Sequence, residues 1–142
     1  MLWLRAIAVW MLIAVAETIH GTLRRLFIVP AIGELRSHQL GVVVGCALIL
    51  FISWLCARWL GARTREDQIK VGVLWLVLIL IFEFSLGLAF GMSWERMLAD
   101  YDLSQGGLML FGLAFLLAAP ALGAKLAGVS THPARSPDAS GN

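Results

Sequence analysis

Apolar residues run along the chain in four long blocks that shorter polar stretches separate. A helix of about 20 apolar residues crosses a hydrocarbon core of ~30 Å, and each block reaches that length. The pattern therefore predicts an all-α fold, an integral membrane four-helix bundle that forms one domain over residues 1–126. Its spans are expected at residues 2–29, 39–60, 71–90 and 107–126.

The polar stretches predict how the spans connect. Pro30 and Gly33 mark a short turn after the first span, so spans one and two should form an antiparallel hairpin. Between spans three and four, apolar residues recur at helical spacing at Trp94, Met97, Leu98 and Tyr101. This spacing predicts a short helix in the outer membrane interface, and a plain connecting loop is the alternative. Residues 127–142, rich in Pro, Ser, Ala and Gly, are expected to form a disordered cytoplasmic tail.

The composition agrees with a membrane protein. Only 14% of the residues are charged, and the mean hydropathy is +0.85, so the chain lies outside the range of soluble globular proteins. The net charge of +2 is small and its basic residues are scattered, which argues against nucleic acid as a partner. The expected partner is therefore the lipid bilayer.

Basic residues are divided unequally between the two sides of the predicted bundle. Seven lie before span one, between spans two and three, or after span four: Arg5, Arg58, Arg63, Arg65, Lys70, Lys125 and Arg135. Four lie on the other side: Arg24, Arg25, Arg36 and Arg96. Because cytoplasmic segments are enriched in Lys and Arg, both termini are predicted to lie in the cytoplasm.

Residues 1–16 also match part of a signal-peptide pattern. Arg5 precedes an apolar stretch, and residues 14–16 form an A-x-A cleavage pattern before Glu17. The helical pattern nevertheless continues through His20 without Pro or Gly. We therefore expect a retained span, with a removed signal peptide as the alternative.

The first span carries charged and polar side chains on one face. At 100° per residue, Glu17, His20 and Arg24 form a polar stripe. Gly21 leaves room beside this stripe, whereas Arg25 points away from it and is expected to reach lipid phosphate. A charge at the centre of a membrane helix costs roughly 2.5–3.5 kcal/mol on insertion scales, so something must offset this cost.

Span three repeats the same design. Glu83, Gly87 and Gly91 share one face at positions i, i+4 and i+8. From the helical rise, Glu83 and Glu17 are expected at nearly the same depth, in the outer half of the membrane. A buried acid needs a nearby cation to stay ionised, so Arg24 is the expected partner of Glu17 or Glu83.

Span two adds small residues and further polar groups. A ridge that allows close helix approach is formed by Gly33, Ser37, Gly41 and Gly45. The expected ligand or partner cluster comprises Glu17, His20, Arg24, Arg25, Glu34, His38 and Glu83. The expected packing glycines are Gly21, Gly41, Gly45, Gly87 and Gly91. The alternative for the polar residues is a structural salt-bridge network that fixes the helix register.

Catalytic chemistry has less support in the sequence. Glu17 and His20 form the Glu-x-x-His pair that di-iron bundles use, with Glu83 as a further candidate ligand. Such bundles carry the motif twice, however, and the nearby arginines repel a cation. Cys46 and Cys56 have no neighbouring base, and no G-x-S-x-G pattern occurs. No metal or other cofactor is expected, and enzymatic activity is not favoured.

Three segments carry a resemblance to a known family: AETIHGTLRRLFIVPAIGELRSHQLGV, FEFSLG and SWERMLADYDLSQGG. Over residues 5–124 the chain resembles an uncharacterised family of small bacterial four-span inner-membrane proteins. The resemblance implies a bacterial inner membrane and a four-helix architecture. It implies no activity, cofactor or ligand.

Three functions remain open from the sequence. The first is a binding or accessory module whose polar cluster holds an anionic or amphiphilic ligand, or a charged group of a membrane partner subunit. The second is a proton-coupled transporter with Glu17, His20 and Glu83 as a relay, which would need a homo-oligomer to enclose a path. The third is a membrane-embedded metal or redox enzyme that uses Glu17, His20, Glu34, His38 and Glu83. We favour the first, because the chain carries no catalytic motif.

Overall fold

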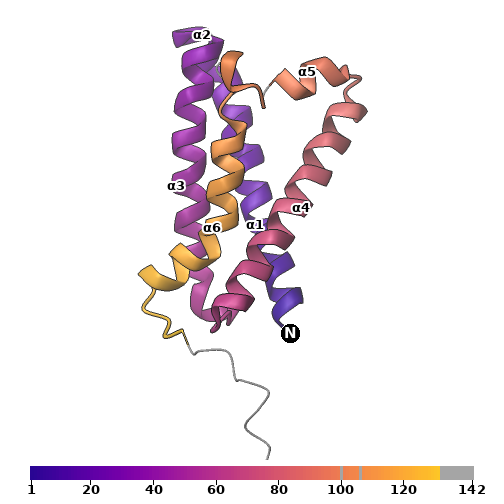
Figure 1. The fold of residues 1–142 in the computed structure, drawn as a ribbon. Coiled ribbons are helices and arrows are strands. Elements are labelled where there is room, and N and C mark those ends of the chain that lie inside the picture. Colours follow the sequence, from indigo (N-terminus) through magenta and orange to yellow (C-terminus); the bar gives the residue numbers. More distant parts are fainter. Residues whose placement is uncertain (100, 106, 132–142) are drawn as a thin grey trace, which may run out of the picture.

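The computed structural model describes residues 1–99, 101–105 and 107–131 (Figure 1). From residue 132 onward, the predicted disordered tail lies outside the described residues. The elements are α1 (Leu2–Leu23), η1 (Arg24–Ile28), α2 (Val29–Ile32), α3 (Glu34–Leu60), α4 (Arg65–Ala89), α5 (Trp94–Ala99), η2 (Leu103–Gln105) and α6 (Met109–Leu126). The predicted all-α four-helix bundle is confirmed, and so is the short helix between spans three and four.

Among the described residues, four helices are long and apolar enough to cross a membrane, as expected of a multi-pass membrane protein. The first runs from Leu2 to Ile32, because α1, η1 and α2 follow one another without a break in the helix. Helices α3 and α4 begin at residues 34 and 65 rather than at the expected residues 39 and 71. Hydropathy marks only the apolar part of a span, whereas the helical backbone continues into the polar residues on either side.

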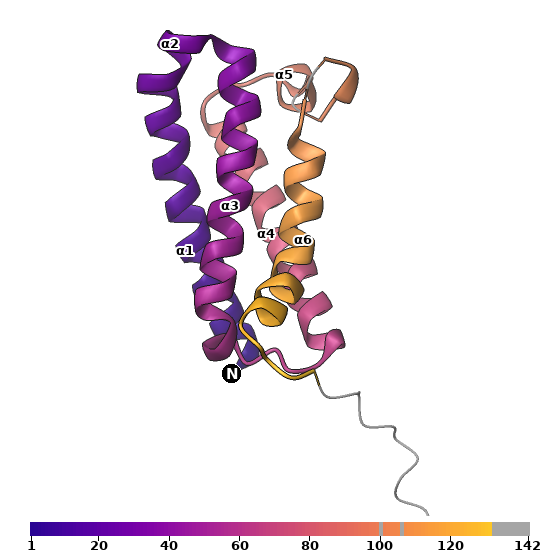
Figure 2. The same cartoon turned by 90° about the vertical axis from the view of Figure 1, so that its left-hand side faces the viewer.

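The helices form a ring in which α6 packs between α3 and α4, while α1 packs against α3 and α4. Figure 2 shows α1, α3 and α6 side by side, with α4 behind them. The N-terminus, the α3–α4 turn and the end of α6 lie at one end of the bundle, which we call the N-terminal end (Figure 1). Helices α2 and α5 lie at the opposite end, which we call the α2 end.

The hydrophobic core is densest toward the N-terminal end. Trp75 is completely buried there among apolar side chains that include Ala6, Val9 and Ala119. The indole Nε1 of Trp75 donates a hydrogen bond to the carbonyl oxygen of Ala6 at 2.8 Å, which joins α4 to α1. This bond satisfies a polar group that would otherwise be costly to bury.

Two glycines outside the predicted set allow helix backbones to pack closely together. A Cβ on Gly123 of α6 would lie 2.8 Å from the carbonyl oxygen of Ser53 in α3. A Cβ on Gly72 of α4 would overlap the carbonyl oxygen of Leu117 in α6. These positions keep α6 against both of its neighbours, as small residues do in membrane bundles.

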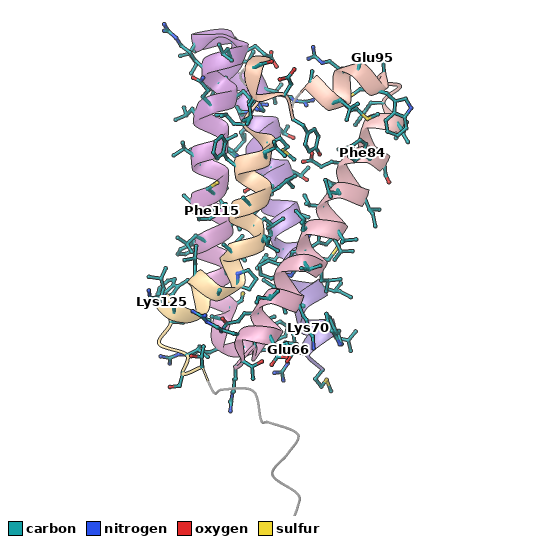
Figure 3. The ribbon with its side chains drawn as sticks, viewed as in Figure 1. Glu66, Lys70, Phe84, Glu95, Phe115 and Lys125 are labelled. Carbon is teal, nitrogen blue, oxygen red and sulfur yellow. The ribbon has the colours of Figure 1, made fainter. Side chains whose placement is uncertain are left out.

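Helix α5 rests on the end of α4. Met97 of α5 is buried against Gly87, which has no side chain to exclude it. The ring of Phe84, labelled in Figure 3, stacks on Tyr101 with ring centroids 6.1 Å apart. Gly91 does not share the predicted packing role, since a Cβ there would meet nothing within 4 Å. Its φ of +68° instead places it in the turn after α4.

Candidate functional site

A cavity of about 230 Å³ lies between α1, α3, α4 and α6, toward the α2 end of the bundle. Its apolar wall includes Ile13, Ile49, Ile79, Leu113 and Leu116. Its polar lining consists mainly of ionisable side chains: Glu17, His20, Arg24, His38 and Glu83. A mostly apolar pocket with a few convergent polar groups is the usual form of a small-molecule site.

The structure brings together five of the seven residues predicted for the polar cluster. Arg25 and Glu34 do not line the cavity, and both are exposed. Three of the predicted packing glycines, Gly21, Gly41 and Gly45, form part of the cavity lining. The cluster therefore does not extend as one surface from Glu34 inward.

Glu17 is paired with His20 from the same helix. Nδ1 of His20 lies 3.4 Å from Oε2 of Glu17, at an i,i+3 spacing. The side chain of His20 is only 17% exposed, and that of Glu17 only 27%. The other carboxylate oxygen of Glu17, Oε1, is buried and has no hydrogen-bond partner among the residues that the structure describes.

Arg24 reaches α3 rather than Glu17. It begins the π-helical segment η1, a type of turn that is frequent at functional sites. Its Nη1 donates a hydrogen bond to the hydroxyl oxygen of Ser37 at 3.2 Å, and Ser37 is completely buried. The expected ion pair of Arg24 with Glu17 is thus not formed. Seven residues along a helix separate the two Cα atoms by roughly 10 Å, and the side chain of Arg24 contacts α3 instead.

The glycines of α3 make room for these polar side chains. A Cβ on Gly41 would lie 2.7 Å from Cδ of Arg24, and a Cβ on Gly45 would lie 3.0 Å from Oε2 of Glu17. The predicted role of this glycine ridge is close helix approach. In the structure, Gly41 instead accommodates the side chain of Arg24 from η1, and Gly45 accommodates the carboxylate of Glu17 from α1.

Two further polar atoms at the cavity lack partners among the described residues. Nε1 of Trp10 and Nε2 of His38 are buried without a hydrogen bond, and both residues line the cavity. Leaving a buried donor or acceptor unpaired costs about 1–3 kcal/mol. Trp10 was not predicted, although it lies seven residues before Glu17 and therefore on the same helical face.

The described part of the chain contains no group of three His, Cys, Asp or Glu side chains arranged to hold a metal ion. Glu17 and His20 form a pair, and the nearest charged group along the same stripe is the cation Arg24. The arrangement is suited to hydrogen bonding and charge recognition.

No family model matches the chain, and neither a curated protein nor a solved structure matches it. The resemblance to a family of small membrane proteins therefore stays a prediction.

Proposed function

We propose that this protein is a binding module that holds a small amphiphilic ligand in the cavity, with an anionic group of the ligand on Arg24. The observation that supports the proposal is an apolar-walled cavity in which several buried polar atoms have no partner in the described structure. A ligand with polar and apolar parts satisfies both kinds of surface. Such a site provides a reason for the ionisable residues in the first span.

Arg24 is the group best suited to hold an anion. A guanidinium carries five N–H donors, and the hydrogen bond found for Arg24 among the described residues is to the neutral hydroxyl of Ser37. Among these residues, neither the hydrogen-bonded pair of Glu17 and His20 nor the ion pair of Glu66 and Lys70 includes Arg24. A hydrogen bond from a charged donor is worth about 1.5–3 kcal/mol.

The cavity volume limits the size of the ligand. An engineered protein cavity of about 150 Å³ binds benzene, which has six non-hydrogen atoms. By proportion, a cavity of about 230 Å³ holds a group of about nine non-hydrogen atoms. The site is therefore suited to a small molecule or to the head group of a lipid, and the lipid tails would remain in the bilayer.

We place the protein in a bacterial inner membrane, with both termini in the cytoplasm and the cavity in the outer half of the membrane. Arg5 and Arg58 both contact main-chain oxygens at the N-terminal end, those of Trp59 and Ala127. Figure 3 shows Lys70 and Lys125 toward this end and Glu95 at the α2 end. The enrichment of cytoplasmic segments in basic residues supports this orientation, and the family resemblance supports the choice of membrane.

Native mass spectrometry of the detergent-solubilised chain tests the proposal. The probes are a mixture of short-chain phospholipids and, in a separate titration, leucine. Arg24→Gln should weaken binding of the retained probe by about tenfold or more, because a bond worth at least about 1.5 kcal/mol is lost.

Arg25→Gln is the matched control, because Arg25 is the adjacent residue, is exposed and does not line the cavity. It should bind the probe as the wild-type chain does. Equal weakening by both substitutions would show that the effect comes from surface charge rather than from the cavity. A wild-type chain that retains neither probe would contradict the proposal.

A further inference from the structure

We propose that the ligand is zwitterionic. Its anionic group binds Arg24, and its ammonium group, which carries N–H donors, binds the carboxylate of Glu17. This inference rests on the proposed function and specifies the chemistry of the second group. The observation behind it is that the cavity has a cationic group, Arg24, and an acidic group, Glu17, which do not form an ion pair with each other. We call these two groups the cationic pole and the acidic pole.

The two poles are spaced along α3. Ser37, Gly41 and Gly45 follow one another at four-residue intervals, each a rise of about 6 Å. The guanidinium of Arg24 lies at the first two positions: Nη1 is 3.2 Å from the Ser37 hydroxyl, and Nε is 3.2 Å from a Cβ built on Gly41.

The carboxylate of Glu17 lies at the third position, with Oε2 3.0 Å from a Cβ built on Gly45. The two charges are thus separated by about one helical turn, or ~6 Å along α3. No ion pair joins Glu17 to Arg24. A dipolar group can lie between the two side chains with its negative end toward Arg24 and its positive end toward Glu17.

The acidic pole has a carboxylate oxygen without a hydrogen-bond partner among the described residues. Oε2 of Glu17 lies near His20, whereas Oε1 is buried without a partner in the described structure. An ammonium group carries three N–H donors and a positive charge, so it can satisfy Oε1 and neutralise the carboxylate. Glu83 of α4 lines the same cavity and adds a second acidic group. A neutral hydroxyl would satisfy only the hydrogen bond.

The lining also indicates which cationic group is favoured. Quaternary ammonium groups have no N–H donors, and proteins usually recognise them in cages of several aromatic rings. Among the described residues, Trp10 is the only Trp, Tyr or Phe that lines this cavity. A primary ammonium is therefore favoured over a trimethylammonium.

Two sources can supply this chemistry at the size of the cavity. Phosphoethanolamine, the head group of phosphatidylethanolamine, has about eight non-hydrogen atoms and leucine has about nine, close to the number inferred from cavity volume. Both place an ammonium group next to an anion.

The test is competition binding by native mass spectrometry with two matched pairs of probes. Short-chain phosphatidylethanolamine competes with phosphatidylcholine, which has the same phosphate but no N–H donors. Leucine competes with isocaproate, which has the same carboxylate and hydrocarbon chain but no ammonium. We expect the wild-type chain to prefer the ammonium-bearing member of one pair by about tenfold, and that pair identifies the source.

Glu17→Gln keeps the size of the side chain and one acceptor but removes the charge. It should abolish the preference by weakening the binding of the ammonium-bearing probe, with little effect on its competitor. Glu34→Gln is the matched control, because Glu34 is an exposed acid outside the cavity. Gly45→Ala gives an independent test, since its new methyl group displaces the Glu17 carboxylate, and it should reduce the same preference.

The outcomes separate this inference from the proposed function. Equal binding of both members of each probe pair would overturn the proposal that the ligand is zwitterionic. So would a preference for the ammonium-bearing probe that Glu17→Gln leaves unchanged. If Arg24→Gln still weakened binding in that case, the anion site on Arg24 would stand. Loss of the Arg24 effect would overturn both proposals. Thermal unfolding of each variant, compared with the wild-type chain, shows that a loss of preference is not a loss of folding.

Discussion

The contact between α3 and α6 at Gly123 gives a stability prediction that does not depend on any ligand. A Cβ at position 123 would lie 2.7 Å from the carbonyl carbon, 2.8 Å from the carbonyl oxygen and 2.9 Å from the Cβ of Ser53. Optimal contacts between carbon atoms are about 3.5–4.0 Å, so the two helices would have to separate by roughly 0.5–1 Å. Two of the three atoms belong to the helix backbone and cannot rotate away.

Gly123→Ala should therefore destabilise the fold by about 1–3 kcal/mol, the usual cost of overpacking a well-packed core. Gly112→Ala is the control in the same helix, because a Cβ there would meet nothing within 4 Å. Its expected effect is a gain of about 0.5–1 kcal/mol from helix propensity.

The assay is equilibrium unfolding in mixed micelles of mild detergent with increasing SDS, followed by circular dichroism. The free energy of unfolding should rank Gly112→Ala at or above the wild-type chain and Gly123→Ala below it. If Gly123→Ala were as stable as Gly112→Ala, the close α3–α6 contact described above would be wrong.

Two further predictions concern the core and the cavity. Trp75→Phe should lower the free energy of unfolding by about 1–3 kcal/mol in the same titration, because the buried hydrogen bond to Ala6 is lost and the smaller ring leaves a cavity in the core; wild-type stability would refute that bond. Gly45→Ala should cost less than about 1 kcal/mol, because the new methyl group meets the end of the flexible Glu17 side chain, 3.0 Å away, rather than backbone. A Gly45→Ala chain as unstable as Gly123→Ala would contradict this difference.

The number and type of the helices could be predicted from the apolar blocks, because a backbone in lipid must satisfy its hydrogen bonds within each helix. The helix ends could not be predicted from hydropathy. Gly33, with φ of +86°, separates α2 from α3, and Gly61, with φ of +74°, ends α3. Thr64 caps α4 by accepting a hydrogen bond from the main-chain N–H of Asp67 at 3.0 Å. These local features lie outside the apolar blocks.

The site could be predicted in part. Helical periodicity correctly placed Glu17, His20 and Arg24 on one face, because all three line the cavity. Arg25 is exposed and does not line the cavity, in agreement with the expectation that it points away from the stripe. Glu34, by contrast, was placed in the predicted cluster but is exposed outside the cavity, because sequence position alone does not fix the direction in which a side chain leaves its helix.

The partner of Arg24 could not be predicted either. Its bond to Ser37 depends on how α3 packs beside the π-helical segment, which has no signature in composition or periodicity. The same is true of Gly123 and Gly72, whose roles depend on the backbone of another helix.

The central claim, that the bundle contains a ligand-binding cavity, is tested most directly by the two cysteines of the unmodified chain. Cys46 lines the cavity, whereas Cys56 packs beside the hydrophobic core farther along α3. The measurement is the rate at which a small water-soluble thiol reagent modifies each cysteine, with and without the preferred probe. At a probe concentration of about ten times Kd, the free fraction of protein falls about tenfold. Modification of Cys46 should slow by that factor while Cys56 is unaffected; equal slowing of both cysteines, or none at Cys46, would contradict the cavity as the binding site.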